Sequence, residues 1–175
     1  MKFIKTYENI ITLDLNKKEE IKLMEYALEE NVISIVKGLL DNNFDPNTLI
    51  QGDSMLIYYI YGRDINLKIV KLLLDYGADV NLIVGNNPPI ILSYAGNYTK
   101  GINSNEYIEL FRLFMKANVK LFVEDEDGLN FFDNLENNSS MNKKTKKEIL
   151  NIVKEESPEQ YQEYIGRKTA IKYNL

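Results

Sequence analysis

The residues with the clearest chemical potential are four consecutive carboxylates: Glu124, Asp125, Glu126 and Asp127. Gly128 follows them, and carboxylate oxygens at this density suit calcium. An EF-hand loop aligned on that glycine would need an acid where Val123 stands and a glutamate where Asn134 stands, so the spacing does not fit such a site. Two interpretations remain: a solvated turn, or an acidic patch that meets a basic partner surface.

The composition restricts other chemistry. The chain has no His and no Cys, which excludes Ser-His-Asp catalysis, thiol chemistry and ordinary zinc sites. Adjacent carboxylates such as Glu29 and Glu30 do not face each other on a helix. We therefore expect a non-catalytic protein without metal or cofactor, and keep an enzyme that uses a distant pair of carboxylates as a remote alternative.

Size and charge indicate a folded acidic domain. The chain has 175 residues, 45% of them hydrophobic, and a formal net charge of −5. This balance argues against nucleic-acid binding. No apolar stretch reaches the ~18 residues of a membrane span, so we expect no membrane association and a cytoplasmic location. Abundant Lys, Asn, Ile and Tyr beside three Arg are typical of an AT-rich bacterial genome.

An internal repeat organises the chain. The segment Ile69–Asn81 has an earlier copy at Ile35–Asn47, displaced by 34 residues. A later copy begins at Leu110, after a further 41 residues, and a weaker one at Ile149, after 39. Apolar residues in each copy follow the i, i+3, i+4, i+7 spacing of one helical face. Each copy is preceded by a shorter predicted helix: Glu19–Glu30, Ser54–Tyr61, Pro89–Ala95 and Asn130–Asn137.

The ends of the longer helices carry a common signal. Asn43, Gly77 and Asn118 occupy the position just after three of them. Gly and Asn enter the left-handed conformation that ends a helix at least cost. These three residues are therefore predicted structural caps.

The segment Lys68–Asn81 closely resembles the second half of an ankyrin repeat, and Ile35–Asn47 supports the resemblance. Where the family has Thr-Pro-Leu-His, this chain has Ser54-Met55-Leu56-Ile57, so Ile57 and its counterpart Ile91 are expected to replace loop hydrogen bonding by packing. The resemblance implies an all-α helical repeat solenoid of about four ankyrin-like repeats with paired antiparallel helices. The predicted parts are an N-terminal cap at 1–16, repeats at 17–49, 50–84, 85–125 and 126–157, and a C-terminal capping helix and tail at 158–175.

Two segments depart from the repeat pattern. Residues 96–103 form an insertion with two glycines, interpreted either as a tolerated loop or as a contact loop around Tyr98. The capping helix is expected to begin at Ser157-Pro158 and to stop at Gly166, leaving a loose basic tail that is either frayed or available to an acidic partner.

The same resemblance implies a binding stripe on the shorter helices. If the register holds, Tyr26, Tyr58 and Leu92 share one outward position, with Glu29, Tyr61 and Ala95 one turn later. In ankyrin-like proteins that position faces the concave groove, and Tyr is common at binding hot spots. The alternative is that these tyrosines fill the core between repeats.

The sequence thus favours a protein-binding module that is a monomer when free. We expect one protein partner with a basic surface, bound by Tyr26, Tyr58, Tyr61, Leu92 and the acidic run. Within that class we favour an immunity or inhibitor protein that masks a basic toxin or effector enzyme. The alternative is a scaffold or host-directed ankyrin effector that recruits a cellular protein. Whether the groove or the 96–103 insertion makes the contact stays open.

Overall fold

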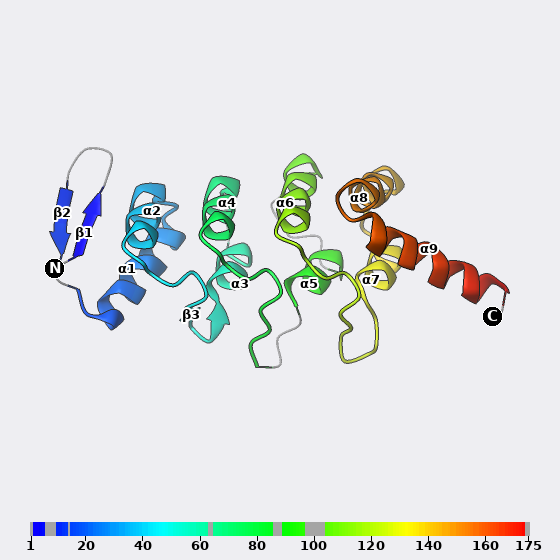
Figure 1. Cartoon of the computed structure of the whole chain (residues 1–175), viewed down its shortest axis with the longest axis horizontal. Helices are drawn as coiled ribbons and strands as arrows, with labels where there is room; N and C mark the ends of the chain where they lie inside the picture. The colour runs from blue at the N-terminus through cyan, green and yellow to red at the C-terminus, as the bar shows by residue number, and fades with distance from the viewer. Residues whose placement is uncertain are drawn as a thin grey trace. The chain divides into compact units, whose positions relative to one another are not determined.

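The computed structural model describes residues 2–5, 10–13, 15–62, 65–85, 89–96 and 104–173 (Figure 1). The chain divides into two compact units, Met1–Asn87 and Pro88–Leu175. The described residues are mostly helical, and their helices follow one another as helix–turn–helix pairs. The helical part of the fold prediction is thereby confirmed, whereas the stacking of all repeats into one solenoid stays a prediction.

The described residues of the first unit form two helix pairs and two short β-hairpins. Its elements are β1 (Lys2–Lys5), β2 (Ile10–Leu13), α1 (Lys17–Glu29), α2 (Ile33–Asp41), β3 (Leu49–Ile50), β4 (Asp53–Ser54), α3 (Met55–Ile60) and α4 (Leu67–Asp75). Strands β1 and β2 pair antiparallel, with Lys2 opposite Leu13, and β1 lies against α2. The segment expected to cover the N-terminal repeat is therefore a hairpin, although residues 1, 6–9 and 14 lie outside the described part.

Where the structure describes the second unit, it has two further helix pairs and a final helix. Its elements are α5 (Ile90–Gly96), α6 (Ser104–Lys116), α7 (Phe131–Asn137), α8 (Lys143–Glu156) and α9 (Pro158–Tyr173). Helix α5 packs on α7, α6 on α8, and α8 on α9. Residues 97–103, which include Tyr98 and almost all of the expected insertion, lie outside the described residues. Tyr94 and Tyr107 flank them, and each hydroxyl donates to the other residue's carbonyl oxygen at 2.5 Å.

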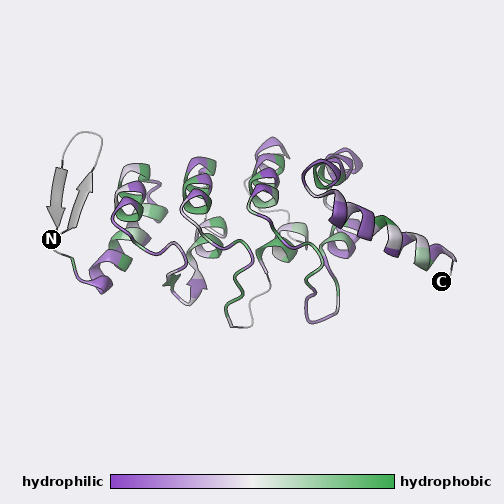
Figure 2. Cartoon of the chain, in the orientation of Figure 1, coloured by the Kyte–Doolittle hydropathy of each residue, from purple (hydrophilic) through white to green (hydrophobic). Residues whose placement is uncertain are grey.

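The longer helices bury the face that the repeat predicts. Val36, Val70 and Phe111, which occupy equivalent positions, are each 0% exposed. Figure 2 shows apolar and hydrophilic residues together on α2, α4 and α6, as expected for helices with one buried face. Ile57 and Ile91 are also buried, in line with a packing role.

The backbone at the three predicted caps lies in the left-handed region. Asn43, Gly77 and Asn118 have φ values of 64°, 92° and 61°. At each site two amides bond back to the helix in the same way. Asn43 N–H donates to Leu40 O at 3.0 Å, and the next amide, Phe44 N–H, donates to Leu39 O at 3.1 Å. This pair of hydrogen bonds is the Schellman motif, and it satisfies carbonyl groups that the helix end would otherwise leave unpaired.

The expected end of the last helix is wrong. Helix α9 continues through Gly166 to Tyr173. Arg167 pairs with Glu163 at 2.7 Å, and its guanidinium lies 4.5 Å from the Phe122 ring centroid. Lys168 contacts Glu136 and Tyr164. A glycine within a helix costs only about 1 kcal/mol of stability. The contacts of Arg167 and Lys168 offset that cost, so the segment expected to be a loose tail is helical.

Candidate functional site

An open groove of about 510 Å³ lies in the first unit. Its described lining residues come from the end of α1, from β4, and from α3 with the turn after it. They are Leu28, Glu29, Asp53, Tyr58, Tyr59, Tyr61 and Gly62. The groove thus combines three tyrosines with two carboxylates on a helical scaffold.

Local sequence explains how Asp53 reaches the groove. Gln51 and Gly52 both have positive φ, 52° and 93°, as the two central residues of a tight hairpin turn require. The turn joins β3 to β4, and Gln51 Nε2 donates to Glu25 Oε1 on α1 at 2.5 Å. Ser54 then caps α3 by accepting from Ile57 N–H at 3.3 Å. The hairpin, α1 and α3 are therefore tied together beside the groove.

Tyr59 supports the groove from the protein side. Its ring is buried, and its hydroxyl donates to Asn31 Oδ1 at 2.5 Å. The same oxygen accepts from Asn66 N–H at 2.7 Å. Asn31 follows α1 and Asn66 caps α4, so one hydroxyl connects two helix ends. Tyr59, which is not one of the predicted stripe tyrosines, therefore has a structural role in joining the end of α1 to the start of α4.

Tyr58 is positioned by a carboxylate. Its hydroxyl donates to Glu29 Oε1 at 2.6 Å. Burial raises the pKa of Tyr58 above its ordinary value, and the hydrogen bond to Glu29 and the charges of Glu29 and Glu25 raise it further. The phenol therefore stays protonated and acts as a hydrogen-bond donor to Glu29.

Tyr61 and Tyr26 present their rings outward. Tyr61 is 51% exposed and lines the groove, whereas Tyr26 is 53% exposed on α1 and does not line it. The expectation of an outward position is wrong for Leu92, which is 4% exposed. Its helix, α5, is buried at every position whose side chain the structure describes, as expected for a helix that is apolar all round.

The acidic run forms the turn before α7. Asp125 faces its own loop, where its Oδ1 accepts from Leu129 N–H at 2.8 Å and from Asp127 N–H at 3.1 Å. The Leu129 amide, which contributes most, and the Asn134 side chain lower the pKa of Asp125. Glu124, Glu126 and Asp127 are exposed. In the described part of the chain, no group of three or more acids is arranged to hold a metal ion.

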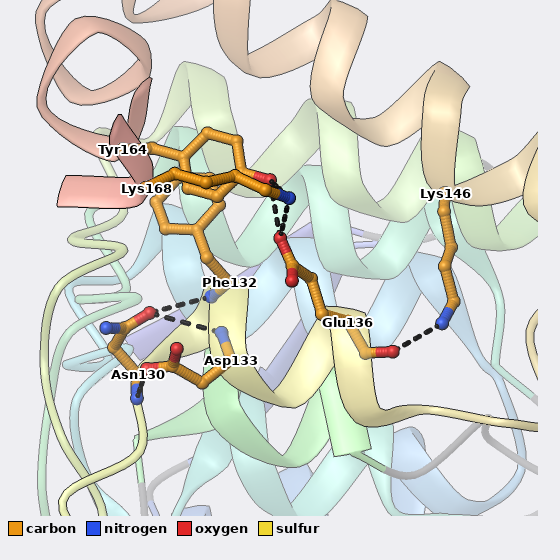
Figure 3. A network of polar contacts seen from close by, with 7 residues as sticks. All are labelled: Asn130, Phe132, Asp133, Glu136, Lys146, Tyr164 and Lys168. Carbon is orange, nitrogen blue, oxygen red and sulfur yellow. Dashed lines mark hydrogen bonds and ion pairs between the residues drawn. The ribbon is translucent and has the colours of Figure 1, made fainter. Parts of the chain in front are cut away.

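A smaller groove of about 260 Å³ lies in the second unit, beside α7 and α9. Figure 3 shows its polar network, in which Tyr164 and Lys168 of α9 converge on Glu136 of α7. Tyr164 Oη donates to Glu136 Oε1 at 2.7 Å, and Lys168 Nζ donates to the same oxygen at 2.6 Å. Burial by itself would raise the pKa of Glu136, but these two hydrogen bonds outweigh it and lower the pKa. The Tyr164 ring stacks on Phe132, with centroids 4.3 Å apart.

Sequence reasoning missed two side-chain amides that bridge neighbouring elements. Asn47 Nδ2 donates to Gly77 O at 3.0 Å, and its Oδ1 accepts from Asp79 N–H at 2.8 Å. Likewise, Gln160 Nε2 donates to Val119 O, and its Oε1 accepts from Leu121 N–H. The signal for Asn47 was present, because Asn81 occupies the equivalent place one repeat later.

Two exposed aliphatic residues were also missed. Leu49 is 46% exposed and Ile83 is 55% exposed, and the 34-residue displacement of the repeat separates them. Comparing solvent-facing positions between the copies would have found them.

Comparison with known protein families gives one match. The ankyrin repeat family model matches residues 51–84, which contain β4, α3, α4 and most of the groove lining. Comparison with curated proteins and with solved structures gives no match. The resemblance to a degenerate ankyrin-repeat protein is confirmed on this segment. Ankyrin repeats are typically non-catalytic and mediate protein–protein binding. Within the described residues, no helix is long and apolar enough to span a bilayer.

Proposed function

We propose that this chain is a non-catalytic binding module that holds one protein partner with a basic surface in the groove of the first unit. Tyr58 and Tyr61 are the proposed contacts inside the groove, and Tyr26 lies outside its lining on α1. The exposed carboxylates Glu124, Glu126 and Asp127 of the second unit are proposed to attract that partner by their charge during encounter. The proposed consequence of binding is inhibition of a basic toxin or effector enzyme.

One observation carries the proposal: the groove combines exposed aromatic surface with carboxylates. Tyrosine supplies a large contact area with few rotatable bonds and a polar tip, which suits the centre of an interface. Glu29 and Asp53 in the lining favour a partner of opposite charge. The match of residues 51–84 to a repeat family that mediates protein binding supports the same function.

The net charge supports the basic character of the partner. A formal charge of −5 steers a basic protein toward this chain and accelerates their encounter. It disfavours acidic competitors by the same repulsion. A toxin that acts on nucleic acid carries such a basic surface, and covering that surface would inhibit it.

The test is affinity capture followed by an activity assay. The full chain is immobilised, and captured proteins are quantified for the wild type, for Tyr61→Ala and for Tyr173→Ala. Tyr173 is the matched control because it is an exposed tyrosine, at 62%, in the other unit. The proposal expects a basic protein that Tyr61→Ala loses and Tyr173→Ala retains, and whose activity falls when the full chain is added. A partner retained equally by both variants would contradict the proposed site.

A further inference from the structure

We propose that the groove of the first unit recognises a single cationic side chain of the partner, a lysine whose ammonium group binds Glu29 beside the rings of Tyr58 and Tyr61. This inference rests on the proposed protein-binding function and specifies the chemistry that the groove selects. It follows from a comparison of two carboxylate–tyrosine pairs within the same chain.

The second unit contains the complete arrangement, which Figure 3 shows. Tyr164 Oη donates to Glu136 Oε1 at 2.7 Å, and Lys168 Nζ lies 2.6 Å from that oxygen. The ammonium is also 3.1 Å from Tyr164 Oη and 5.4 Å from the Tyr164 ring centroid. A carboxylate, a phenol and an aromatic face thus surround one lysine, and each of them attracts a cation.

In its described residues, the first unit contains the same pair without a lysine. Tyr58 Oη donates to Glu29 Oε1 at 2.6 Å, a distance close to that of the Tyr164–Glu136 pair. Among the described residues, no lysine or arginine lines this groove, and none forms an ion pair with Glu29. Glu136 is bound by Lys168 of the same chain, whereas the equivalent place beside Glu29 can be filled by a lysine of a partner.

The surroundings of Glu29 favour a cation further. Asp53 lines the same groove, and Glu25 lies close enough to Tyr58 to raise its pKa. The exposed Tyr61 ring offers a face for an alkyl chain or an ammonium group. The cavity volume of about 510 Å³ falls within the range of roughly 300–1,000 Å³ that is usual for ligand sites.

The experiment titrates the ¹⁵N-labelled full chain with Nα-acetyl-lysine methylamide at low ionic strength and follows amide shifts. Nα,Nε-diacetyl-lysine methylamide is the neutral probe of nearly the same shape. We expect shifts centred on the amides of Tyr61 and Gly62, with the neutral probe at least about fivefold weaker because it lacks the charge. Equal binding of the two probes, or no shift at these amides, would overturn the inference.

Two variants test whether the negative charge of Glu29 is needed to bind the lysine probe. Glu29→Gln keeps an oxygen that can accept from Tyr58 but removes the negative charge. It should lower the affinity for the lysine probe at least about fivefold. Glu30→Gln, the exposed neighbour that does not line the groove, should change binding less than about twofold. Thermal unfolding of both variants checks that the fold is kept. Equal affinity of Glu29→Gln and wild type would also overturn the inference.

The outcomes separate this inference from the proposed function. If Tyr61→Ala loses the partner while the lysine probe leaves the groove unshifted, the binding function stands and the lysine specificity is wrong. If the lysine probe binds and needs Glu29 while Tyr61→Ala retains the partner, the cation site stands and the partner docks elsewhere.

Discussion

At the scale of single residues, the molecule depends on small polar side chains with a defined backbone or bridging role. Asn43, Gly77 and Asn118 end three helices in the left-handed conformation. Asn47 connects two neighbouring repeats through the backbone at Gly77 and Asp79. Such amides supply hydrogen bonds between the loops of neighbouring repeats.

The cap at Gly77 makes a prediction that isolates backbone conformation from packing. A Cβ added at Gly77 meets no atom within 4 Å, so any cost of substitution comes from φ at +92°. Gly77→Ala should destabilise the fold by about 1–2 kcal/mol, and Gly77→Val by more, because a β-branched residue resists this conformation. Gly77→Asn should recover most of the loss, since Asn43 and Asn118 fill the same role. Urea unfolding measures the series, and an alanine variant as stable as wild type would show that the cap is not strained.

The Glu136 network predicts a pH dependence. The pKa of Glu136 is lowered in the folded protein, so the folded state binds the proton less readily than the unfolded chain does. The stabilising contribution is present above the ordinary glutamate pKa of 4.5 and is lost as the pH falls through the lowered folded value. Glu136→Gln should therefore flatten the loss of stability below about pH 4.5. The exposed Glu148→Gln is the control, and unfolding is measured in urea from pH 7 to pH 3.

At the scale of elements, helix boundaries were largely predictable because apolar spacing and cap residues agreed. Asn130 and Ser54 begin their helices, as their residue types suggest. The stop predicted at Gly166 failed because the residues beyond it, Arg167 and Lys168, gain contacts with Phe122 and Glu136. A pattern within one helix carries no information about such distant partners.

Helix α4 gives a packing prediction with a control beside it. Leu73 is 0% exposed, and its helix contacts α2 and α3. Leu73→Ala should cost about 2–5 kcal/mol, because it removes a buried side chain and leaves a cavity. The adjacent Leu74 is only half-buried, so Leu74→Ala should cost clearly less. Equal losses in urea unfolding would show that the helical face has been assigned wrongly.

At the scale of the whole molecule, the repeat pattern predicted the helix pairs but not which of their residues are exposed. Tyr58 and Tyr61 do line one groove. Leu92 was extrapolated from the register, but it is buried, as are the other α5 residues whose side chains the structure describes. Glu29 was in register with Tyr61, yet its pairing with Tyr58 depends on how α1 and α3 meet. Equivalent positions in degenerate repeats can therefore have different exposure.

Kinetics separate the role proposed for the acidic run from the role proposed for the groove. Neutralising Glu124, Glu126 and Asp127 should mainly slow association and flatten its salt dependence, because exposed charges steer encounter. Asp125 is left unchanged, since it holds the turn. Association rates measured at several salt concentrations check this expectation. Faster dissociation without a change in association would show that the run is a central contact.

The central claim is that the groove of the first unit holds the partner, and the dissociation rate of the purified complex tests it most directly. Tyr61→Ala should speed dissociation enough to cost about 1–3 kcal/mol of binding free energy, as expected for an aromatic anchor. Tyr173→Ala, the exposed tyrosine of the other unit, should leave the rate unchanged. A Tyr61→Ala variant that unfolds like the wild type and releases its partner at the wild-type rate would contradict the claim.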